Sequence, residues 1–205
     1  MPIFFQQQIN ATTRLGIWKI EETEQFFLAN VPVQNAVTHP HKRLQHLAGR
    51  FLLQFLFADF PYSLIRIADT RKPYLEDEQY HFSISHCADF AAAIVSSDRR
   101  VGLDIETNSQ KAAKVSPKFL SASEQPVLHA CRNTFGPRAE TLLWCCKESA
   151  YKWYGDGKVD FRKDIRLTTF RLQDETVVCN FSKCDRDLDI RFHGFENLVV
   201  AWIDD

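Results

Sequence analysis

The stretch LLWCCKESAYKWYG, residues 142–155, sets three charged side chains into a segment that is otherwise suited to burial. On a helix, Trp144, Glu148 and Lys152 are spaced i, i+4 and i+8 and therefore share one stripe. Glu148 placed before Lys152 is also an ordinary helix-stabilising pair, worth about 0.3 kcal/mol. Because buried charges need partners, the other interpretation is that a metal ion and an anionic ligand meet this stripe. The pattern predicts a helix and leaves both interpretations of its charges open.

The composition of the chain limits the classes of protein to which it can belong. Its 205 residues allow one large domain or two small ones, with 45% apolar and 25% charged residues. A net charge of −1 argues against a broad nucleic-acid surface. No apolar run approaches the ~20 residues that span a bilayer, and the N-terminal sequence has no signal-peptide pattern. We expect a cytoplasmic protein that binds neither nucleic acid nor a membrane.

The six cysteines form no C-x-x-C pair and no cluster with histidine at metal-ligand spacing. A zinc site is therefore not expected. In a cytoplasmic chain the simplest interpretation of these cysteines is that they are buried thiols.

Helical and strand patterns occur twice along the chain in the same order. Helical patterns are expected at 21–31, 39–60, 121–135 and 139–155, and strand patterns at 80–86, 90–97, 99–106, 164–172, 175–181, 188–195 and 198–203. Two successive blocks of helices followed by strands predict an α+β fold with two similar halves, residues 1–108 and 109–205. The stretch 106–117 is the expected join, and a cleft between the halves is the expected place for an active site.

The strand pattern RVGLDIE, residues 100–106, carries two carboxylates on one face. Strand side chains alternate, so Asp104 and Glu106 point to the side opposite Val101, Leu103 and Ile105, with about 6–7 Å between the two acids. Like charges so placed repel each other unless a positive charge lies between them. A solvated outer face of the strand is one interpretation. A Mg²⁺ site is the other, because Mg²⁺ prefers one or two carboxylates together with water and substrate phosphates.

Three further segments offer groups that can meet an anion. They are Arg43, His46 and Arg50 on the second helix, Ser85 and His86 at a strand end, and Arg71 with Lys72 before Pro73. Each set is also compatible with a solvated surface. Taken together with the acids they predict a Mg²⁺-dependent site for a polyphosphate ligand, with a general base and a cation that neutralises the leaving group.

The motifs RKPYL, FSISHC, VGLDIE, KFLSASE and LWCCKESAYK occur in an order and spacing that resemble the 4′-phosphopantetheinyl transferases of the larger, surfactin-synthetase-activating (Sfp) type. The resemblance runs from about residue 43 to residue 157. The most specific part is the pair G-[IVL]-D-[IVL]-E and W-x-x-K-E-[SA]-x-x-K. It implies a monomer with a pseudo-two-fold arrangement of two similar α+β halves. It also implies a holo-[acyl-carrier-protein] synthase activity, in which the 4′-phosphopantetheine group of coenzyme A is transferred to a serine of an apo acyl or peptidyl carrier protein and adenosine 3′,5′-bisphosphate is released.

The resemblance also implies roles for individual residues. Asp104, Glu106 and Glu148 match the Mg²⁺-binding acids, and Glu148, Lys152 and Asp104 are the expected catalytic residues. The residues expected to bind coenzyme A are Arg43, His46, Arg50, Lys72, Pro73, Ser85, His86, Lys147 and Lys152. Among these, Lys147 lies about 100° around the helix from Glu148, so it is expected either to serve the phosphates from another side or to position Glu148.

The expected chemistry assigns a proton acceptor and a cation to the opening stretch. Glu148 takes the proton of the carrier serine, either directly or through water, and Lys152 stabilises the departing bisphosphate. Three other interpretations remain compatible with the sequence. They are a catalytically silent module that holds coenzyme A, a different Mg²⁺-dependent phosphohydrolase or phosphotransferase, and a structural protein with an incidental charged cleft. We expect a local basic or apolar patch on the surface of this protein as the binding site of the carrier, because carrier proteins of this sort are usually acidic.

Overall fold

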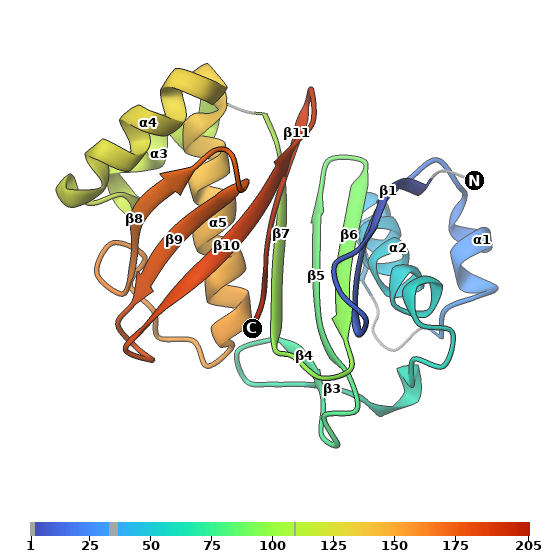
Figure 1. The fold of residues 1–205 in the computed structure, drawn as a ribbon. Helices are drawn as coiled ribbons and strands as arrows, with labels where there is room; N and C mark the ends of the chain where they lie inside the picture. The colour runs from blue at the N-terminus through green and yellow to red at the C-terminus, as the bar shows by residue number, and fades with distance from the viewer. Residues whose placement is uncertain (1–2, 33–36, 109) are drawn as a thin grey trace. The chain divides into compact units, whose positions relative to one another are not determined.

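A computed structural model describes residues 3–32, 37–108 and 110–205 of the chain (Figure 1). The chain divides into two compact units, one formed by Met1–Leu103 with Asp204 and the other by Asp104–Ile203 with Asp205. Each unit contains both helices and antiparallel strands, so the expected α+β class is confirmed. The expectation of two similar halves that divide after residue 108 stays a prediction.

The first unit is built on a four-stranded antiparallel sheet in the order β1-β2-β6-β5. The strands of this sheet are β1 (Ile3–Gln8), β2 (Thr13–Lys19), β5 (His81–Cys87) and β6 (Phe90–Ser96). The remaining elements are α1 (Glu24–Leu28), α2 (Pro40–Leu56), the 3₁₀ turn η1 (Tyr62–Leu64), and the small antiparallel pair β3 (Ile65–Ile67) and β4 (Pro73–Leu75).

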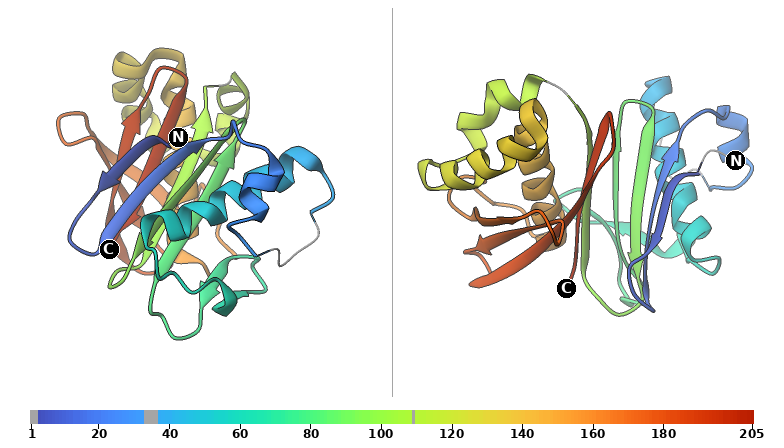
Figure 2. Two further views of the ribbon diagram at one scale, coloured as in Figure 1. Left: turned by 90° about the vertical axis from the view of Figure 1, so that its right-hand side faces the viewer. Right: turned by 45° about the horizontal axis from the view of Figure 1, so that its top comes forward.

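The long helix α2 packs against β2, β5 and β6 (Figure 2). Its apolar side chains are buried there in the main apolar cluster of the unit. It begins at Pro40, a residue favoured in the first turn because it lacks the N–H that would have no partner there. Gly49 brings the helix very close to the sheet, since a Cβ at this position would lie 2.6 Å from Ile84 Cγ2 on β5. This close approach places the polar edge of α2, with His46 and Arg50, beside the end of β5 that carries His86.

The second unit contains a five-stranded sheet in the order β7-β11-β10-β9-β8, and the division between the units falls within its first strand. The strands are β7 (Val101–Thr107), β8 (Ile165–Arg171), β9 (Thr176–Phe181), β10 (Arg186–Gly194) and β11 (Leu198–Asp204). The helical elements are α3 (Gln110–Phe119), η2 (Ala122–Glu124), α4 (Gln125–Phe135), η3 (Gly136–Arg138) and α5 (Ala139–Tyr154).

The central helix of this unit is α5, which contains the stretch rich in both aromatic residues and charges. It packs against α3, α4, β8 and β10 and belongs to the main apolar cluster of the unit. It ends where Gly155 adopts φ +83°, a left-handed conformation that favours glycine. The buried thiol of Cys145 lies 3.1 Å from the backbone oxygen of Asp104, so α5 and β7 are in direct contact next to the predicted acids.

Three parts of the fold differ from the sequence prediction. The expected join at 106–117 is largely the helix α3, which continues to Phe119 with Pro117 inside it. The hairpin β1–β2 and the small pair β3–β4 have no counterpart among the predicted strands. The remaining strand predictions and the four helical patterns are confirmed within a few residues at their ends, although the first helix is limited to Glu24–Leu28. None of the helices in the described residues is long and apolar enough to cross a membrane.

Candidate active site

The predicted acids and the predicted lysine of the second unit lie close together, on β7 and α5. Lys152 Nζ donates to Asp104 Oδ1 at 2.7 Å, so the lysine reaches from the helix to the strand. Asp104 is only 4% exposed, which makes the solvated-face interpretation of this strand wrong. The positive charge that two neighbouring carboxylates require is therefore supplied within the chain by Lys152.

The second carboxylate of β7 is held by the tryptophan of the same helical stripe. Trp144 Nε1 donates to Glu106 Oε1 at 3.2 Å. The Trp144 ring lies between two phenylalanine rings, with centroid distances of 5.0 Å to Phe119 and 5.5 Å to Phe161. The sequence predicted that Trp144 shares a helical stripe with Glu148 and Lys152, but it gave no indication of the hydrogen bond to Glu106.

Burial and mutual repulsion change the proton affinity of the acids. Burial, followed by the charge of Asp104, raises the pKa of Glu148 to about 7. The same two causes raise the pKa of Glu106 to about 7, although the Trp144 N–H and the charge of Lys152 oppose the change. For Lys152, burial works to lower the pKa, but the charge and hydrogen bond of Asp104 and the charge of Glu148 outweigh it and raise the pKa. The acids are thus a cluster with more negative than positive charge.

The first prediction concerns the pH dependence of stability in the metal-free protein. A carboxyl group whose pKa is higher in the folded than in the unfolded state binds more protons when folded, so its contribution to stability falls as pH rises. For Glu106, with a folded pKa of about 7 against the ordinary value of 4.5, this loss occurs between about pH 4.5 and pH 7. We therefore expect Glu106→Gln to be more stable than the wild type at pH 8 and nearly equal to it at pH 4.5.

Thermal unfolding in a chelating buffer from pH 4.5 to pH 8 measures this difference. Asp156→Asn is the matched control, because Asp156 is an exposed acid of the same unit. Its melting temperature should follow that of the wild type at every pH. Parallel curves for the wild type and Glu106→Gln would contradict the electrostatic account of the cluster.

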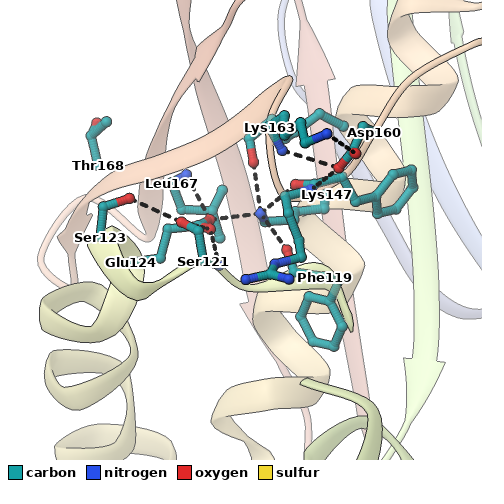
Figure 3. Close-up of polar contacts among 12 residues, drawn as sticks. Phe119, Ser121, Ser123, Glu124, Lys147, Asp160, Lys163, Leu167 and Thr168 are labelled. Carbon is teal, nitrogen blue, oxygen red and sulfur yellow. Dashed lines mark hydrogen bonds and ion pairs between the residues drawn. The ribbon is translucent and has the colours of Figure 1, made fainter. Parts of the chain in front are cut away.

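Lys147 does not belong to this cluster, and the prediction that it binds the coenzyme is wrong. Its side chain is fully buried, and its Nζ donates to the backbone oxygens of Phe119, Phe161 and Ile165 at 2.8, 2.7 and 2.6 Å (Figure 3). It also forms an ion pair of 2.6 Å with Glu124, which is fully buried too. An ammonium group has three hydrogens to donate, and these four oxygens already surround it.

Most of the residues of the first unit that were predicted to bind coenzyme A line a cavity of about 380 Å³. Five of the predicted residues are in its wall: Arg43, His46, Arg50, Pro73 and His86. The rest of the lining is mainly apolar and includes Ile65, Phe82 and Ile84. Among the described residues Lys72 and Ser85 are not part of the lining, and Ser85 is 6% exposed.

Charges within this cavity favour an anionic ligand. The rings of His46 and His86 meet edge to face at 5.3 Å. Burial, followed by the charges of Arg50 and Lys42, lowers the pKa of His46, because the positive form is unfavourable there. Arg43 is partly engaged by Glu24, with Arg43 Nη2 2.9 Å from its carboxylate. A phosphate group would relieve this excess of positive charge.

Arg71 also lines this cavity, although it was not among the residues predicted to bind coenzyme A. It has a left-handed backbone conformation with φ +66°, which is unusual for a residue other than glycine. The segment before Pro73 had suggested either a phosphate contact or a side chain in solvent. Its place in the cavity wall favours the first of these.

A second cavity, of about 1050 Å³, lies in the second unit beside Glu148. Its wall includes the aromatic rings of Phe119, Trp144, Tyr151 and Phe161. Four lysines also line it: Lys118, Lys158, Lys163 and Lys183. Lys163 and Lys183 have carboxylates of Asp160 and Asp164 at 3.6 Å, whereas Lys118 and Lys158 are exposed. Because Glu148, Asp160 and Asp164 line it as well, this cavity is apolar with a small excess of positive charge, which lies at the exposed Lys118 and Lys158. We call it the basic cavity.

The expected magnesium ligands are not pre-assembled as a metal cluster. Within the ranges that the structure describes, no group of three or more His, Cys, Asp or Glu side chains has a ready metal-binding arrangement. Asp104 instead accepts from Lys152. The chemistry of the donor set still suits a hard divalent cation, because Glu106 and Glu148 are carboxylates with raised pKa values that a cation would lower.

Comparisons with known proteins give one matching family and several relatives. The family model described as the 4′-phosphopantetheinyl transferase superfamily matches residues 100–203. Enterobactin synthase component D of Salmonella typhi is 35% identical over 118 residues, which cover 56% of this chain and 49% of that protein. The same component of Escherichia coli (strain K12) is 33% identical over 114 residues, or 54% of each chain.

A third relative is similar over a longer part of the chain. The protein named 4′-phosphopantetheinyl transferase gsp of Aneurinibacillus migulanus is 29% identical over 137 residues, which cover 67% of this chain and 56% of that protein. The chain spans about half the length of the curated relatives it matches.

Proposed function

This chain belongs to the 4′-phosphopantetheinyl transferase superfamily, and from that premise we propose that it transfers the 4′-phosphopantetheine group of coenzyme A to a serine of an apo carrier protein, with release of adenosine 3′,5′-bisphosphate. The observation that carries the proposal is the contact of Lys152 with Asp104, in a cluster that also contains Glu106 and Glu148. All four residues belong to the two most specific motifs.

The finer assignment, to the larger Sfp type, is also part of the proposal. It is supported by the presence of two compact units, each with its own sheet and its own apolar cluster. A monomeric state and a cytoplasmic location remain predictions.

The proposed reaction forms one bond and breaks another at the β-phosphorus of coenzyme A. The serine oxygen bonds to this phosphorus while the bond to the oxygen of adenosine 3′,5′-bisphosphate breaks. The serine proton goes to Glu148, whose pKa of about 7 suits a group that accepts a proton near neutral pH. Lys152, kept positive by its contact with Asp104, donates hydrogen bonds to the leaving phosphate oxygens as negative charge develops.

Magnesium is proposed as the metal, with Asp104, Glu106 and Glu148 as the residues that would hold it. When bound, Mg²⁺ withdraws charge from the pyrophosphate oxygens and orients the group that is transferred. The proposal is supported by the oxygen donors of the three carboxylates and by the raised pKa values of Glu106 and Glu148. The Trp144 N–H restrains the Glu106 carboxylate, as outer partners of metal ligands commonly do.

The cavity of the first unit is proposed to take the adenosine end of coenzyme A with its 3′-phosphate. Apolar side chains suit the adenine ring, and Arg50, His86 and Arg71 suit the phosphate. The cavity beside Glu148, with its aromatic wall and four lysines, suits an acidic carrier whose serine must reach Glu148. This basic patch is the kind expected from the sequence for a carrier-binding enzyme of low net charge.

The test of the function is direct transfer. The protein is incubated with coenzyme A, Mg²⁺ and a panel of apo-carriers from fatty-acid, polyketide and non-ribosomal-peptide systems. The intact mass of each carrier is then measured by mass spectrometry. We expect at least one acidic carrier to gain one phosphopantetheine group, and its serine-to-alanine variant to gain none. Stabilisation by coenzyme A without transfer to any carrier would favour the silent binding module. Stabilisation by a free nucleotide but not by coenzyme A would favour a different phosphotransferase.

The second prediction concerns the 3′-phosphate of coenzyme A. If Arg50 and His86 hold this group, dephospho-coenzyme A should bind the wild type more than tenfold more weakly than coenzyme A, since charge-assisted hydrogen bonds contribute roughly 1.5–3 kcal/mol each. Arg50→Ala should discriminate less between the two ligands. Dissociation constants from titration calorimetry measure both effects.

Arg66→Ala is the matched control, because Arg66 is an exposed arginine of the same unit that pairs with Glu76 and does not line the cavity. It should keep the discrimination of the wild type. Unchanged discrimination in Arg50→Ala would remove Arg50 from the 3′-phosphate site.

A further inference from the structure

Lys147 is a charged residue of the most specific motif that the proposed chemistry does not use. Its ammonium group is fully buried one position before Glu148, and three backbone oxygens and one carboxylate surround it. Burying an ammonium group costs desolvation free energy. An apolar side chain of similar length would stabilise the helix without this cost, so helix stability alone does not explain a lysine at this position. The specific groups that it binds indicate what else it does.

The partner of Lys147 ties together three separate segments of the unit. Glu124 Oε1 lies 2.6 Å from Lys147 Nζ and also accepts from the backbone N–H of Leu167 on β8 at 3.0 Å. Its other oxygen, Oε2, accepts from the backbone N–H and the hydroxyl of Ser121, both at 2.7 Å (Figure 3). Both oxygens of this buried carboxylate are therefore used, and the end of α3, the start of α4 and β8 are fixed relative to α5.

Two of the backbone oxygens that bind Lys147 belong to the residues that enclose Trp144. Phe119 and Phe161 accept from the ammonium through their carbonyls, while their rings contact Trp144 at 5.0 and 5.5 Å. Trp144 in turn donates to Glu106. A continuous set of contacts thus leads from Lys147, through the backbone and rings of two phenylalanines, to the carboxylate of Glu106.

The same residues form one wall of the basic cavity. Phe119, Trp144 and Phe161 line it together with Glu148. Asp160 and Lys163, which also line it, lie within two residues of Phe161, whose carbonyl binds Lys147. The segment after α5 also contacts this helix through the ring of Phe161, which lies 5.5 Å from the Trp144 ring and 5.6 Å from the Tyr151 ring. The ammonium is therefore placed to hold this wall against the helix that carries Glu148 and Lys152.

We propose that Lys147, with Glu124, is a positioning residue that fixes the aromatic wall beside Glu148 and, through Trp144, the carboxylate of Glu106. The part of this inference that concerns activity rests on the proposed function. The part that concerns the position of Trp144 rests on geometry alone. Positioning partners of site residues typically change activity by about 10- to 100-fold when they are removed.

The test compares two ways of removing the ion pair. Lys147→Met leaves the carboxylate of Glu124 buried without its cation, which endangers folding. The double variant Lys147→Met/Glu124→Gln leaves no buried charge, and the amide oxygen of Gln can still accept from a backbone N–H. The matched control is Arg132→Met, because Arg132 forms another ion pair, between α4 and the buried Glu140 of α5, that has no contact with the aromatic wall.

Two properties are measured for each folded variant, at a temperature well below its melting temperature. The first is kcat for transfer together with the coenzyme A Kd. The second is hydrogen exchange of the Trp144 indole N–H by NMR, with the resonance assigned from Trp144→Phe. In the double variant we expect kcat to fall about tenfold, Kd to change less than twofold, and the indole N–H to exchange at least tenfold faster. Arg132→Met should lower the melting temperature and leave the other properties unchanged.

If the Trp144 indole N–H of the folded double variant exchanges at the wild-type rate, the proposal is overturned, whatever value of kcat this variant has. If exchange is faster but kcat stays within twofold of wild type, the positioning role in transfer is refuted. If the wild type itself transfers to no carrier, the proposed function fails, and the indole exchange alone then decides whether Lys147 positions Trp144. The two failures are therefore distinguishable.

Discussion

Replacing Asp104 by Ala is expected to abolish phosphopantetheine transfer while the fold stays intact. The side chain is 4% exposed and accepts from Lys152 at 2.7 Å, and its charge raises the pKa values of both Glu106 and Glu148. The substitution therefore removes a proposed Mg²⁺ ligand, and it also removes the group that holds the ammonium of Lys152 in place. Because both losses act on the same reacting phosphate, we expect no measurable transfer rather than a partial decrease.

The measurement is intact mass of the carrier after long incubation with coenzyme A at saturating Mg²⁺. Circular dichroism and thermal unfolding show whether the variant is folded. Asp156→Ala, at an exposed position of the same unit, should retain wild-type transfer. Asp104→Asn separates the charge from the shape, since an amide can still accept from Lys152 but binds Mg²⁺ poorly. Near-normal transfer by Asp104→Ala would disprove the proposed metal site.

The strands and helices that surround this site could be predicted because the spacing of their apolar residues corresponds to the face that each element buries. The alternation in β7 and the spacing of α5 placed Asp104, Glu148 and Lys152 correctly on their elements. The strand β1 could not be predicted in this way, since its sequence IFFQQQ shows no alternation and most of its residues are exposed. The helix α3 was missed because its sequence combines polar residues with Pro117, which is usually a sign of a loop or a helix end.

The error at Lys147 has a different cause. Spacing on a helix shows that Lys147 and Glu148 point in different directions, but it does not show which direction leads to a ligand and which to the protein interior. Lys147 can be buried because Glu124 is its partner. In the sequence, however, Glu124 belongs to a capping box, and the role of this motif at the start of a helix already explains an acid at that position. The backbone oxygens of Phe119, Phe161 and Ile165 leave no sequence signal, because every residue has one.

The effect of Lys152→Ala on turnover distinguishes two roles that the sequence left open. As one member of a helix pair with Glu148, the lysine would contribute a few tenths of a kcal/mol to stability and almost nothing to turnover. In the structure its Nζ instead donates to Asp104 on β7, and its pKa is raised by Asp104 and Glu148 against the effect of burial. A cation held in this way, next to the proposed phosphate site, stabilises charge that develops on the leaving group more than charge already present on bound coenzyme A.

We therefore expect Lys152→Ala to lower kcat by about a hundredfold or more, and to change the coenzyme A Kd much less. Lys152→Arg should restore only part of the loss, because a planar guanidinium does not reproduce a compact ammonium in the 2.7 Å contact with Asp104. The measurement is kcat with apo-carrier in excess and the coenzyme A Kd for the wild type and both variants. Lys118→Ala, at an exposed lysine of the neighbouring cavity, is the control for a general loss of positive charge and should change KM for the carrier rather than kcat. A kcat for Lys152→Ala within about threefold of wild type would leave the helix pair as the sole role of this lysine.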